Sequence, residues 1–313
     1  MTEEKKKEMS ILSKALNMIK YPERIIFHLN LTPFQKLIPN KFCLKCVYKT
    51  RTGRKLNLKN PVLFNEKLQW LKLYNHQDIY TTMVDKYEAK KFIGDRIGYE
   101  YVIENLGVWD SVDDIDVSAL PDQFVLKSNH DSKGIYICTD KNTFDLKKAK
   151  AFLKKHLDFD YFYAGREWPY KNVKRRIIAE RYMKDLADGE LRDYKFFCFD
   201  GEPKALYITQ GRDSGNETVA DFFDMEFNHL DMKIDHETAP IMPHKPVNFE
   251  LMKGLAAKLS EGVPHLRVDF YEVDGKVYVG ELTFFHCGGF SNFRPESAGK
   301  MFGDWIKLPE IKK

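Results

Sequence analysis

The segment that most constrains this chain, residues 267–283, sets acidic residues on both sides of an Asp-Gly turn. Asp274-Gly275 stands between two β-rich runs, which strongly indicates a hairpin. A two-residue loop would pair Asp269 with Gly280 and put Asp269 and Glu281 on opposite faces. A three-residue loop, residues 273–275, pairs residue 267 with 281 and 269 with 279. Because side chains alternate along a strand, this register puts four polar side chains on one face: Arg267, Asp269, Glu281 and Thr283.

The polar face of this predicted hairpin has the chemistry of a metal–phosphate site. Carboxylates offer the hard oxygen ligands that Mg²⁺ prefers, and a guanidinium binds an oxyanion with two parallel hydrogen bonds. Val268, Phe270 and Leu282 occupy the opposite face, which can pack on a core. The alternative interpretation, a surface hairpin with solvated charges, stays open from this segment alone.

Size and charge exclude several classes of protein. The chain has 313 residues, which predicts two or three subdomains. Its 50 basic and 46 acidic residues are nearly balanced, so charge does not favour a nucleic-acid partner. Five cysteines, an odd number in a chain of this size, favour a reducing compartment, and we expect a cytoplasmic protein.

Hydropathy predicts no membrane-spanning segment, because no apolar run approaches the ~18 residues that a span requires. The charged start of the chain has no apolar core behind it, so we do not expect a secretory signal. Residues 11–31 carry apolar side chains at mixed helical spacing. A packed helix and a helix lying on a membrane surface both remain open for this segment, and the pattern favours the packed helix.

The periodicity predicts an α+β, or mixed α/β, fold. Helical spacing occurs at residues 63–74, with Asn65 as the N-cap, and at residues 80–97, 143–157 and 249–261. Strand patterns occur around residues 101–103 and within residues 173–182. They also flank a polar loop at residues 124–137 and an Asp200-Gly201 turn. Antiparallel strand runs with helices between them are typical of this class.

A second candidate site is the loop between the apolar strands of residues 124–137. Lys127 ends the first strand, and a small polar loop that includes Ser132 and Gly134 returns to the second. Such a loop can lay backbone N–H groups over phosphates while the lysine neutralises their charge. No Walker motif is present. An ordinary hairpin loop remains the alternative.

Three weaker motifs complete the sequence-level candidates. Residues 177–183 end an apolar strand with Glu180, and a strand edge beside a carboxylate can bind adenine. Residues 85–90 alternate in charge, which usually means a solvated helix face. Asp114-Ile115-Asp116 is a D-x-D motif, which binds a metal-bound nucleotide sugar in glycosyltransferases.

In order along the chain, Asp85-Lys86, Phe124-Val125-Leu126-Lys127, Ala179-Glu180-Arg181-Tyr182 and the hairpin acids resemble the ATP-grasp superfamily. The chain is more similar still to the TupA-like branch, found with bacterial cell-surface polysaccharide genes. Four strings, from about residue 50 onward, carry that likeness: LFNEKLQW at residues 63–70, LPDQFVLK at 120–127, LRDYKFFCF at 191–199 and GELTF at 280–284.

This resemblance implies an ATP-grasp-like fold in which two α+β subdomains grip ATP. It implies a mostly helical N-terminal region (residues 1–76), a linker or first lobe (77–120), a small subdomain (121–185) and a catalytic Mg-ATP subdomain (186–313).

The resemblance also implies roles for individual residues. The phosphates of ATP would contact Lys86 and Lys127. Glu180 would meet the adenine amino group, with Arg181, Tyr182 and Met183 as hinge backbone and Asp193 near the ribose. Asp269 and Glu281 would bind Mg²⁺ and Arg267 would stabilise an anionic intermediate. The third metal position, often Asn in the superfamily, is Thr283 here. A substrate group would enter at residues 286–289.

The resemblance implies the activity of an ADP-forming carboxylate–amine ligase that works through an acyl phosphate. It implies ATP and Mg²⁺ as cofactors. The implied product is a modified cell-surface polysaccharide or its precursor. Two other enzyme classes stay open: a glycosyltransferase that uses the D-x-D motif, and a phosphotransferase on the same fold that acts on a sugar. A binding module without activity is disfavoured, because degenerate nucleotide-binding folds commonly lose groups such as Lys127, Asp269 and Glu281.

Overall fold

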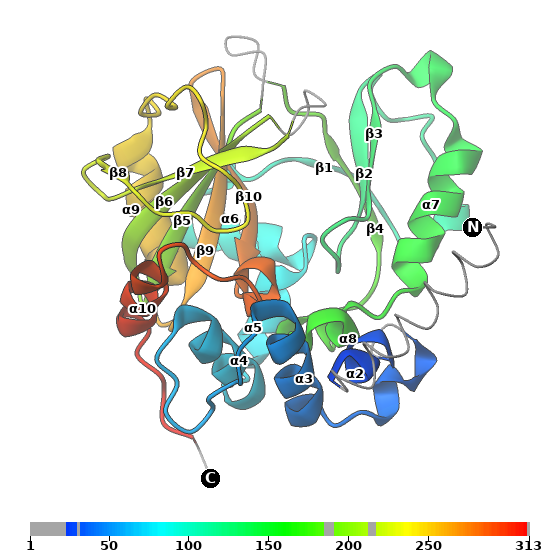
Figure 1. The fold of residues 1–313 in the computed structure, drawn as a ribbon. Helices are drawn as coiled ribbons and strands as arrows, with labels where there is room; N and C mark the ends of the chain where they lie inside the picture. The colour runs from blue at the N-terminus through cyan, green and yellow to red at the C-terminus, as the bar shows by residue number, and fades with distance from the viewer. Residues whose placement is uncertain (1–22, 30–31, 185–190, 212–216, 312–313) are drawn as a thin grey trace, which may run out of the picture.

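Two antiparallel sheets face each other in the structure, a computed structural model that describes residues 23–29, 32–184, 191–211 and 217–311 (Figure 1). The larger sheet has six strands in the order β10-β9-β5-β6-β7-β8, and the smaller has four in the order β1-β4-β2-β3. Helix α7 packs on the smaller sheet, and α4, α9 and α10 pack on the larger one. The α+β class expected from the sequence is confirmed.

The strands of the smaller sheet are β1 (Asn105–Trp109), β2 (Phe124–Ser128), β3 (Ile135–Cys138) and β4 (Ile177–Arg181). Those of the larger sheet are β5 (Asp193–Phe199), β6 (Glu202–Gln210), β7 (Val219–Phe223), β8 (His229–Leu230), β9 (Leu266–Val273) and β10 (Lys276–Thr283).

The described α-helices are α2 (Glu23–Leu29), α3 (Asn40–Thr52), α4 (Phe64–Tyr74), α5 (Asp78–Val84), α6 (Glu88–Ile97), α7 (Leu146–Asp158), α8 (Tyr161–Gly165), α9 (Phe249–Ser260) and α10 (Glu296–Trp305). Short 3₁₀ turns η1 to η6 comprise Pro33–Leu37, Tyr99–Tyr101, Val112–Asp114, Lys141–Thr143, Trp168–Tyr170 and His286–Gly289.

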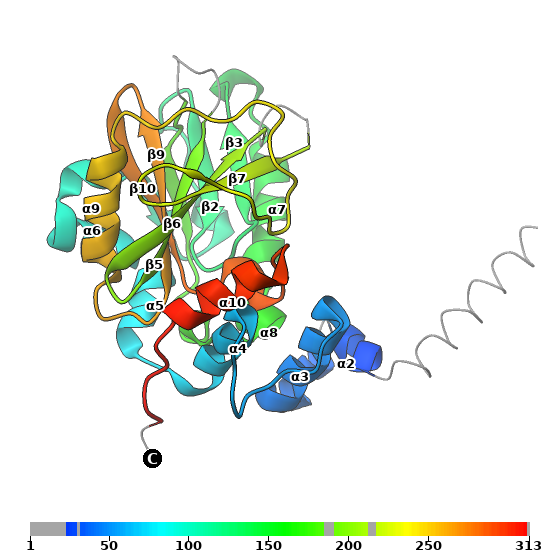
Figure 2. The same cartoon turned by 60° about the vertical axis from the view of Figure 1, so that its left-hand side comes forward.

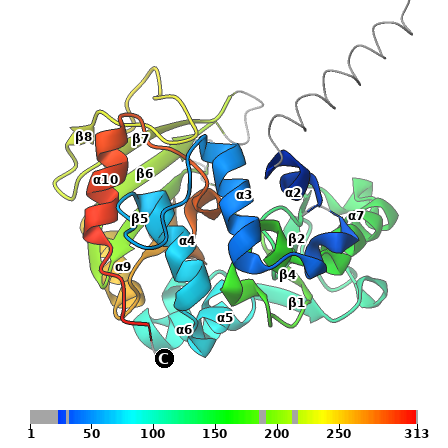
Figure 3. The same cartoon turned by 60° about the horizontal axis from the view of Figure 1, so that its bottom comes forward.

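Each sheet has its own hydrophobic core. Ala149 and Leu153 of α7 are fully buried against the smaller sheet, together with Phe124, Leu126 and Ile177. The larger sheet shares its core with α4, α9 and α10, whose apolar faces it covers. Figure 2 shows α9 on the outer face of the larger sheet, and Figure 3 shows α4 beside α10. Helix α9 packs on one face of the larger sheet, against Phe196, whereas α4 and α10 pack on the other, against Phe197. Because side chains alternate along a strand, the face of Phe197 also carries Lys195 and Arg267.

The helix predicted over residues 80–97 is two helices, α5 and α6, and that prediction was wrong. The Asp85 carboxylate breaks the run because its Oδ1 accepts the backbone N–H groups of Tyr87 (2.9 Å) and Glu88 (3.4 Å). It also accepts Asn129 Nδ2 at 2.8 Å. Asp85 is 3% exposed, so the solvated helix face expected here is corrected as well. A buried acid that caps α6 instead ties the helix to the end of β2.

Two further sequence predictions need correction. Asn65 lies inside α4 rather than at its N-cap, and its side chain accepts the Tyr48 hydroxyl at 2.8 Å and donates to the Ser291 carbonyl at 2.9 Å. Glu66 satisfies the helix start instead, since its Oε2 accepts the N–H groups of residues 62 and 63. No regular strand forms at residues 101–103, where one was expected: Val102 forms only an isolated bridge to Val279. The strand β1 begins later in the chain, at Asn105.

None of the helices in the described ranges is both long and apolar enough to cross a membrane. Most of the segment at residues 11–31 lies outside the described residues, apart from α2. The division of the chain into an N-terminal region, a first lobe and two subdomains stays a prediction.

Two helix glycines provide a matched test of the packing. A Cβ on Gly303 of α10 would lie 2.0 Å from the Val62 carbonyl oxygen, whereas one on exposed Gly254 of α9 would meet no atom within 4 Å. We expect Gly303→Ala to lower the free energy of unfolding by about 3 kcal/mol, because backbone cannot yield to the methyl group. Gly254→Ala should raise it by about 0.8 kcal/mol, since alanine favours helix.

Urea unfolding of both variants measures these changes in the free energy of unfolding. Equal stability of Gly303→Ala and the wild type would contradict the α4–α10 contact.

Candidate active site

The hairpin of β9 and β10 carries the acidic face, but in a register that differs from the prediction. Its loop has two residues, Asp274 and Gly275, both with positive φ, and Val273 pairs with Lys276. The extra residue is a bulge at Gly280, so Asp269 pairs with Glu281 and Arg267 with Thr283. A side chain at Gly280 would lie 2.8 Å from the ring of Tyr271, which favours glycine at the bulge. The bulge restores the predicted grouping on one face.

Arg267 is buried and binds every other member of the acidic face. Its Nε and Nη2 donate to the two carboxylate oxygens of Asp269 at 2.7 and 2.6 Å. Nη2 also donates to Glu281 Oε1 and to Thr283 Oγ1, each at 3.1 Å. Burial raises the pKa of Asp269, and Arg267 only partly offsets this. For Glu281, burial is outweighed by the nearby cations, and the pKa falls below its ordinary value.

The neighbouring strand β5 adds a lysine to this face. Lys195 pairs with Asp269 in the register of β5 and β9, and its Nζ lies 3.8 Å from Asp269 Oδ2 and 2.9 Å from Asp193 Oδ2. Asp193 also accepts Thr209 Oγ1 at 3.3 Å. Asp193, expected near a ribose, is thus joined to the acidic face through Lys195.

On the smaller sheet, Glu180 is clamped between two lysines. Lys127 of the adjacent strand β2 contacts Oε2, and Lys90 of α6 donates to Oε1 at 2.7 Å. Burial alone raises the pKa of Glu180, but Lys127 and Lys90 outweigh it and lower the pKa to about 2. Lys90 also donates to the Ile103 carbonyl at 2.6 Å. The carboxylate therefore connects α6 to the smaller sheet.

The loop after β2 is organised by Asp131. Its Oδ1 accepts Ser128 Oγ and, at 3.0 Å, the N–H of Gly134, while its Oδ2 contacts His156 Nδ1 at 2.5 Å. Lys86 donates to the Asp131 carbonyl, and Ser132 accepts the Tyr161 hydroxyl at 3.1 Å. A Cβ on Gly134 would lie 2.0 Å from Ser128 Oγ. The loop thus holds Lys86 close to the end of β2.

The two sheets enclose a cavity of about 490 Å³, and the expected hinge residues line it. Arg181, Tyr182 and Met183 follow β4 on one side, and Asp193 and Tyr271 contribute from the larger sheet. The remaining lining is mostly apolar: Ile103, Val125, Lys127, Ile135, Ile137, Thr139, Glu180 and Leu191. A smaller hollow beside it is lined by Lys86, Glu180 and Glu281 together. An apolar slot bordered by charged groups suits a nucleotide.

The donor set of the acidic face fits Mg²⁺. Asp269, Glu281 and Thr283 present only oxygen atoms, the ligands of a hard cation. Thr283 Oγ1 donates to Glu281 Oε1 at 3.1 Å, which orients the carboxylate. Arg267 and Lys195 supply the compensating positive charge.

Three residues of this site were missed by sequence reasoning: Lys90, Lys195 and His286. Lys90 stands four residues after Lys86, so the two share a helix face, which was the available signal. Lys195 stands two residues after Asp193 on the same face of a strand. His286 Nδ1 contacts Arg267 Nη1 at 2.6 Å and its Nε2 lies 3.5 Å from Asp235 Oδ2. Burial lowers the pKa of His286 to about 4, so the ring is neutral and can accept from Arg267.

The D-x-D motif lies away from these residues. Asp114 ends η3 and Asp116 follows it, both exposed, while Ile115 is buried beneath α7. Neither carboxylate lines the cavity between the sheets.

The clamp on Glu180 predicts a pH effect on stability. Its pKa is about 2 in the folded chain against an ordinary value of 4.5, so its stabilising contribution is complete above about pH 4.5 and is lost as the pH falls toward 2. Glu180→Gln removes this contribution. We expect the stability difference between wild type and variant to be constant from about pH 5 to 7 and to shrink by about 1 kcal/mol by about pH 3.5. Urea unfolding across this range measures it; a difference that does not change with pH would contradict the ion pairs.

Solved structures similar to this one include ATP-grasp enzymes. D-alanine–D-alanine ligase from Bacillus anthracis, complexed with ATP, is 16% identical, with a TM-score of 0.41, over 72% of this chain and 63% of that one. The Helicobacter pylori D-alanine–D-alanine ligase is 12% identical, with a TM-score of 0.41, over 79% and 69%. The ATP-grasp ligase PsnB, complexed with minimal precursor, Mg and ADP, is 11% identical, with a TM-score of 0.40, over 78% and 66%. The chain thus spans just under two thirds of the Bacillus ligase.

No curated protein matches the chain. The family model described as TupA-like ATPgrasp matches residues 66–307, which include both sheets and every residue of the site described above. This match covers well over half of the sequence. The chain therefore belongs to the TupA-like ATP-grasp family.

Proposed function

We propose that this protein is an ATP-dependent, ADP-forming carboxylate–amine ligase. One observation carries the proposal: Lys86 and Lys90 line a hollow together with Glu281 of the acidic face, and Lys127 lines the cavity beside it. A triphosphate needs cations for its oxygens, and a metal that bridges those oxygens needs carboxylates opposite. The D-alanine ligases and PsnB, which carry the name of ligase, are consistent with this activity.

In this proposal the nucleotide lies between the sheets. The adenine occupies the apolar slot near Tyr182 and Met183, with Glu180 facing its amino group and Asp193 near the ribose. Lys86 and Lys127 neutralise the phosphates from the smaller sheet. Mg²⁺ would be held by Asp269 and Glu281, with Thr283 beside them, and would supply charge neutralisation to the phosphate oxygens.

The chemistry then requires positioning more than a protein nucleophile. A substrate carboxylate oxygen attacks the γ-phosphorus, the bond to the bridging oxygen breaks, and an acyl phosphate and ADP form. An amine then attacks the acyl carbon, phosphate leaves, and the amine loses its proton. Asp269 and His286 hold the Arg267 guanidinium in a fixed position. In the proposed reaction this fixed cation would stabilise the negative charge that develops in the transition state.

The likeness of the strings at residues 63–70 and 191–199 to the TupA-like branch supports a product in cell-surface polysaccharide assembly. A uronic acid carboxylate and an amino-acid amine are the substrate classes that we would test first. The exposed position of the D-x-D motif gives a glycosyltransferase no structural support.

Binding of Mg-ATP can be tested without knowing the substrates. A ligand that binds only the folded state stabilises it by about 2.7 kcal/mol at 100 times its Kd. We expect Mg-ATP at about 1 mM to raise the melting temperature of the wild type. We expect Lys127→Ala to lose this shift. The control is Lys148→Ala, an exposed lysine on α7, which should keep it. No shift in the wild type, or the same shift in Lys127→Ala, would contradict the nucleotide site.

Hydroxylamine separates the ligase from a phosphotransferase. In reactions with ATP and each of a panel of uronic and amino acids, an acyl phosphate is trapped as a hydroxamate, whereas a phosphorylated alcohol is not. ADP formation with hydroxamate supports the ligase. ADP formation without hydroxamate, accompanied by a stable sugar phosphate, would assign a phosphotransferase instead.

The acidic face can be tested with matched amide variants. We expect Asp269→Asn and Glu281→Gln each to lower turnover by about 10²-fold or more, the effect of losing one electrostatic partner of the transition state. Asp274→Asn on the same hairpin is the control: it is exposed, has a φ of 48°, and asparagine adopts that conformation readily. It should keep turnover within about twofold. ADP release measures all three, and near-wild-type rates in both site variants would overturn the metal assignment.

A further inference from the structure

The N-terminal helices combine positive charge with exposed apolar side chains. Residues 23–55 contain eight lysine and arginine residues and a single acidic residue, Glu23, whereas the whole chain has a net charge of only +4. The remainder of the chain is therefore net acidic. A basic segment on a chain whose remainder is net acidic favours an anionic partner.

Large apolar side chains are exposed within this basic segment. Phe34 and Leu37 of η1 are 62% and 79% exposed, and Phe42 at the start of α3 is 50% exposed. Ile25 of α2 is 42% exposed. These four side chains lie close together in the sequence, on α2, η1 and the start of α3.

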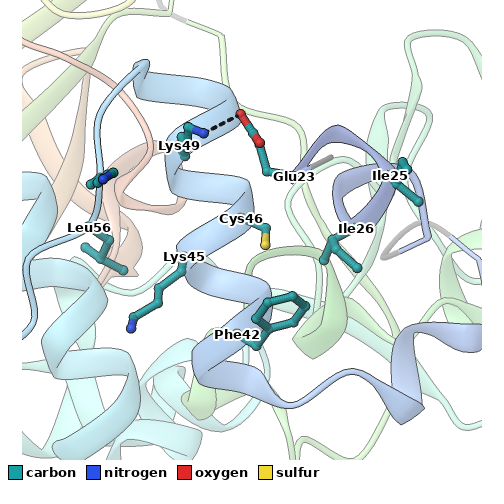
Figure 4. Close-up of a pocket in the computed structure, with 9 residues that line it drawn as sticks. Glu23, Ile25, Ile26, Phe42, Lys45, Cys46, Lys49 and Leu56 are labelled. Carbon is teal, nitrogen blue, oxygen red and sulfur yellow. Dashed lines mark ion pairs between the residues drawn. The ribbon is translucent and has the colours of Figure 1, made fainter. Parts of the chain in front are cut away.

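The apolar surface leads into a groove between α2 and α3. The groove has a volume of about 570 Å³ and is walled by Ile25, Ile26, Phe42, Cys46 and Leu56. Figure 4 shows Phe42 and Cys46 of α3 turned toward Ile26 of α2, while Lys45 points away from them on the other side of α3. Glu23 is neutralised at its edge by Lys49, at 3.0 Å. With this acid counted, the segment still has seven more basic than acidic residues.

The lysines around the groove are available for a partner. Lys36, Lys41, Lys45 and Lys55 are exposed, and within the part of the chain that the structure describes none of them has an acidic group at ion-pair distance. Lysines that surround apolar side chains at one surface match the requirements of an anionic bilayer, which offers negative headgroups above an apolar interior. A nucleic acid would use the lysines but not Phe34 and Leu37.

The helices that carry this surface are fixed to the substrate end of the site. Arg166, which ends α8 and is buried, donates to the Gln35 carbonyl at 2.7 Å and to Asn40 Oδ1 at 3.1 Å. The next residue, Glu167, lies close to Gly288 of the loop that begins at His286. A partner bound at η1 and α3 is therefore held near the open end of the cleft.

We propose that α2, η1 and α3 form a docking surface for an anionic lipid bilayer, into which Phe34, Leu37 and Phe42 insert while the surrounding lysines contact lipid headgroups. This surface is independent of the proposed ligase activity. It gives the chain a peripheral membrane contact through α2, η1 and α3.

Sedimentation with lipid vesicles tests the surface on the full chain. We expect the protein to pellet with vesicles of phosphatidylglycerol and phosphatidylcholine but to remain in the supernatant with phosphatidylcholine alone, and to be released by about 0.5 M NaCl, which screens the charges. No binding to anionic vesicles, equal binding to neutral ones, or pelleting without vesicles through self-association would overturn the proposal.

Charge-reversal variants locate the binding surface. Lys41→Glu with Lys45→Glu should weaken partitioning by at least about 100-fold, given roughly fivefold for each unit of charge near an anionic membrane. The matched control is Lys147→Glu with Lys148→Glu on α7, which makes the same change in net charge at exposed lysines on a helix whose apolar residues pack inward. If the α7 variant loses binding as strongly as the α3 variant, net charge alone is responsible and the proposal fails.

Apolar variants separate a bilayer from other anionic partners. Phe34→Ser with Leu37→Ser should reduce vesicle binding about tenfold or more, because it removes the inserted side chains. Ile241→Ser with Val247→Ser, at residues that are 78% and 91% exposed elsewhere, is the control and should bind normally. Retained binding by the Phe34 and Leu37 variant would show a purely electrostatic site, such as one for a nucleic acid. Circular dichroism of each variant confirms that it is folded.

Discussion

Glu180 is a buried carboxylate whose charge is balanced by lysines from two different parts of the fold. A charge removed from water is stable only with good partners, and here they come from strand β2 and helix α6. The same requirement determines much of the site's surroundings. The Asp85 carboxylate can be buried because Asn129 and the start of α6 donate hydrogen bonds to it. The Asp269 carboxylate can be buried because Arg267 and Lys195 compensate its charge. The helices around the cleft are therefore positioned by the acids that the cleft contains.

The hairpin shows how far a local pattern predicts a site. Alternation along the strands correctly grouped Arg267, Asp269, Glu281 and Thr283, because any register that pairs the acidic positions must put them on one face. The location of the extra residue was wrong. Asp274 and Gly275 form a two-residue loop that the sequence itself favours, and the irregularity moves to Gly280, where the ring of Tyr271 fills the space of a side chain. That contact depends on packing across the hairpin, which periodicity does not encode.

Elements held by local signals were predictable, and those held by distant contacts were not. Helix α7 begins at its Asp145 cap and buries one face, so its spacing alone located it. The burial of Asp85 depends on an asparagine 44 residues away, and the pairing of Lys90 with Glu180 links residues that only the folded chain brings together. The phosphate loop and the strand ending in Glu180 were identified as candidates, but their convergence on one cavity required the resemblance to a family. The roles of individual site residues remain proposals.

The two lysines on Glu180 have different consequences for the proposed nucleotide site. Lys127 lies in the cavity wall and contacts Glu180, so a triphosphate bound as proposed would compete for its ammonium group. If Lys127 turned toward phosphate with no second cation present, Glu180 would be left as an uncompensated buried charge, which is strongly unfavourable. Lys90 prevents this, because it stays on Oε1 and is anchored by the Ile103 carbonyl. Glu180 can then remain ionised as an acceptor for an adenine amino group while Lys127 serves the phosphates.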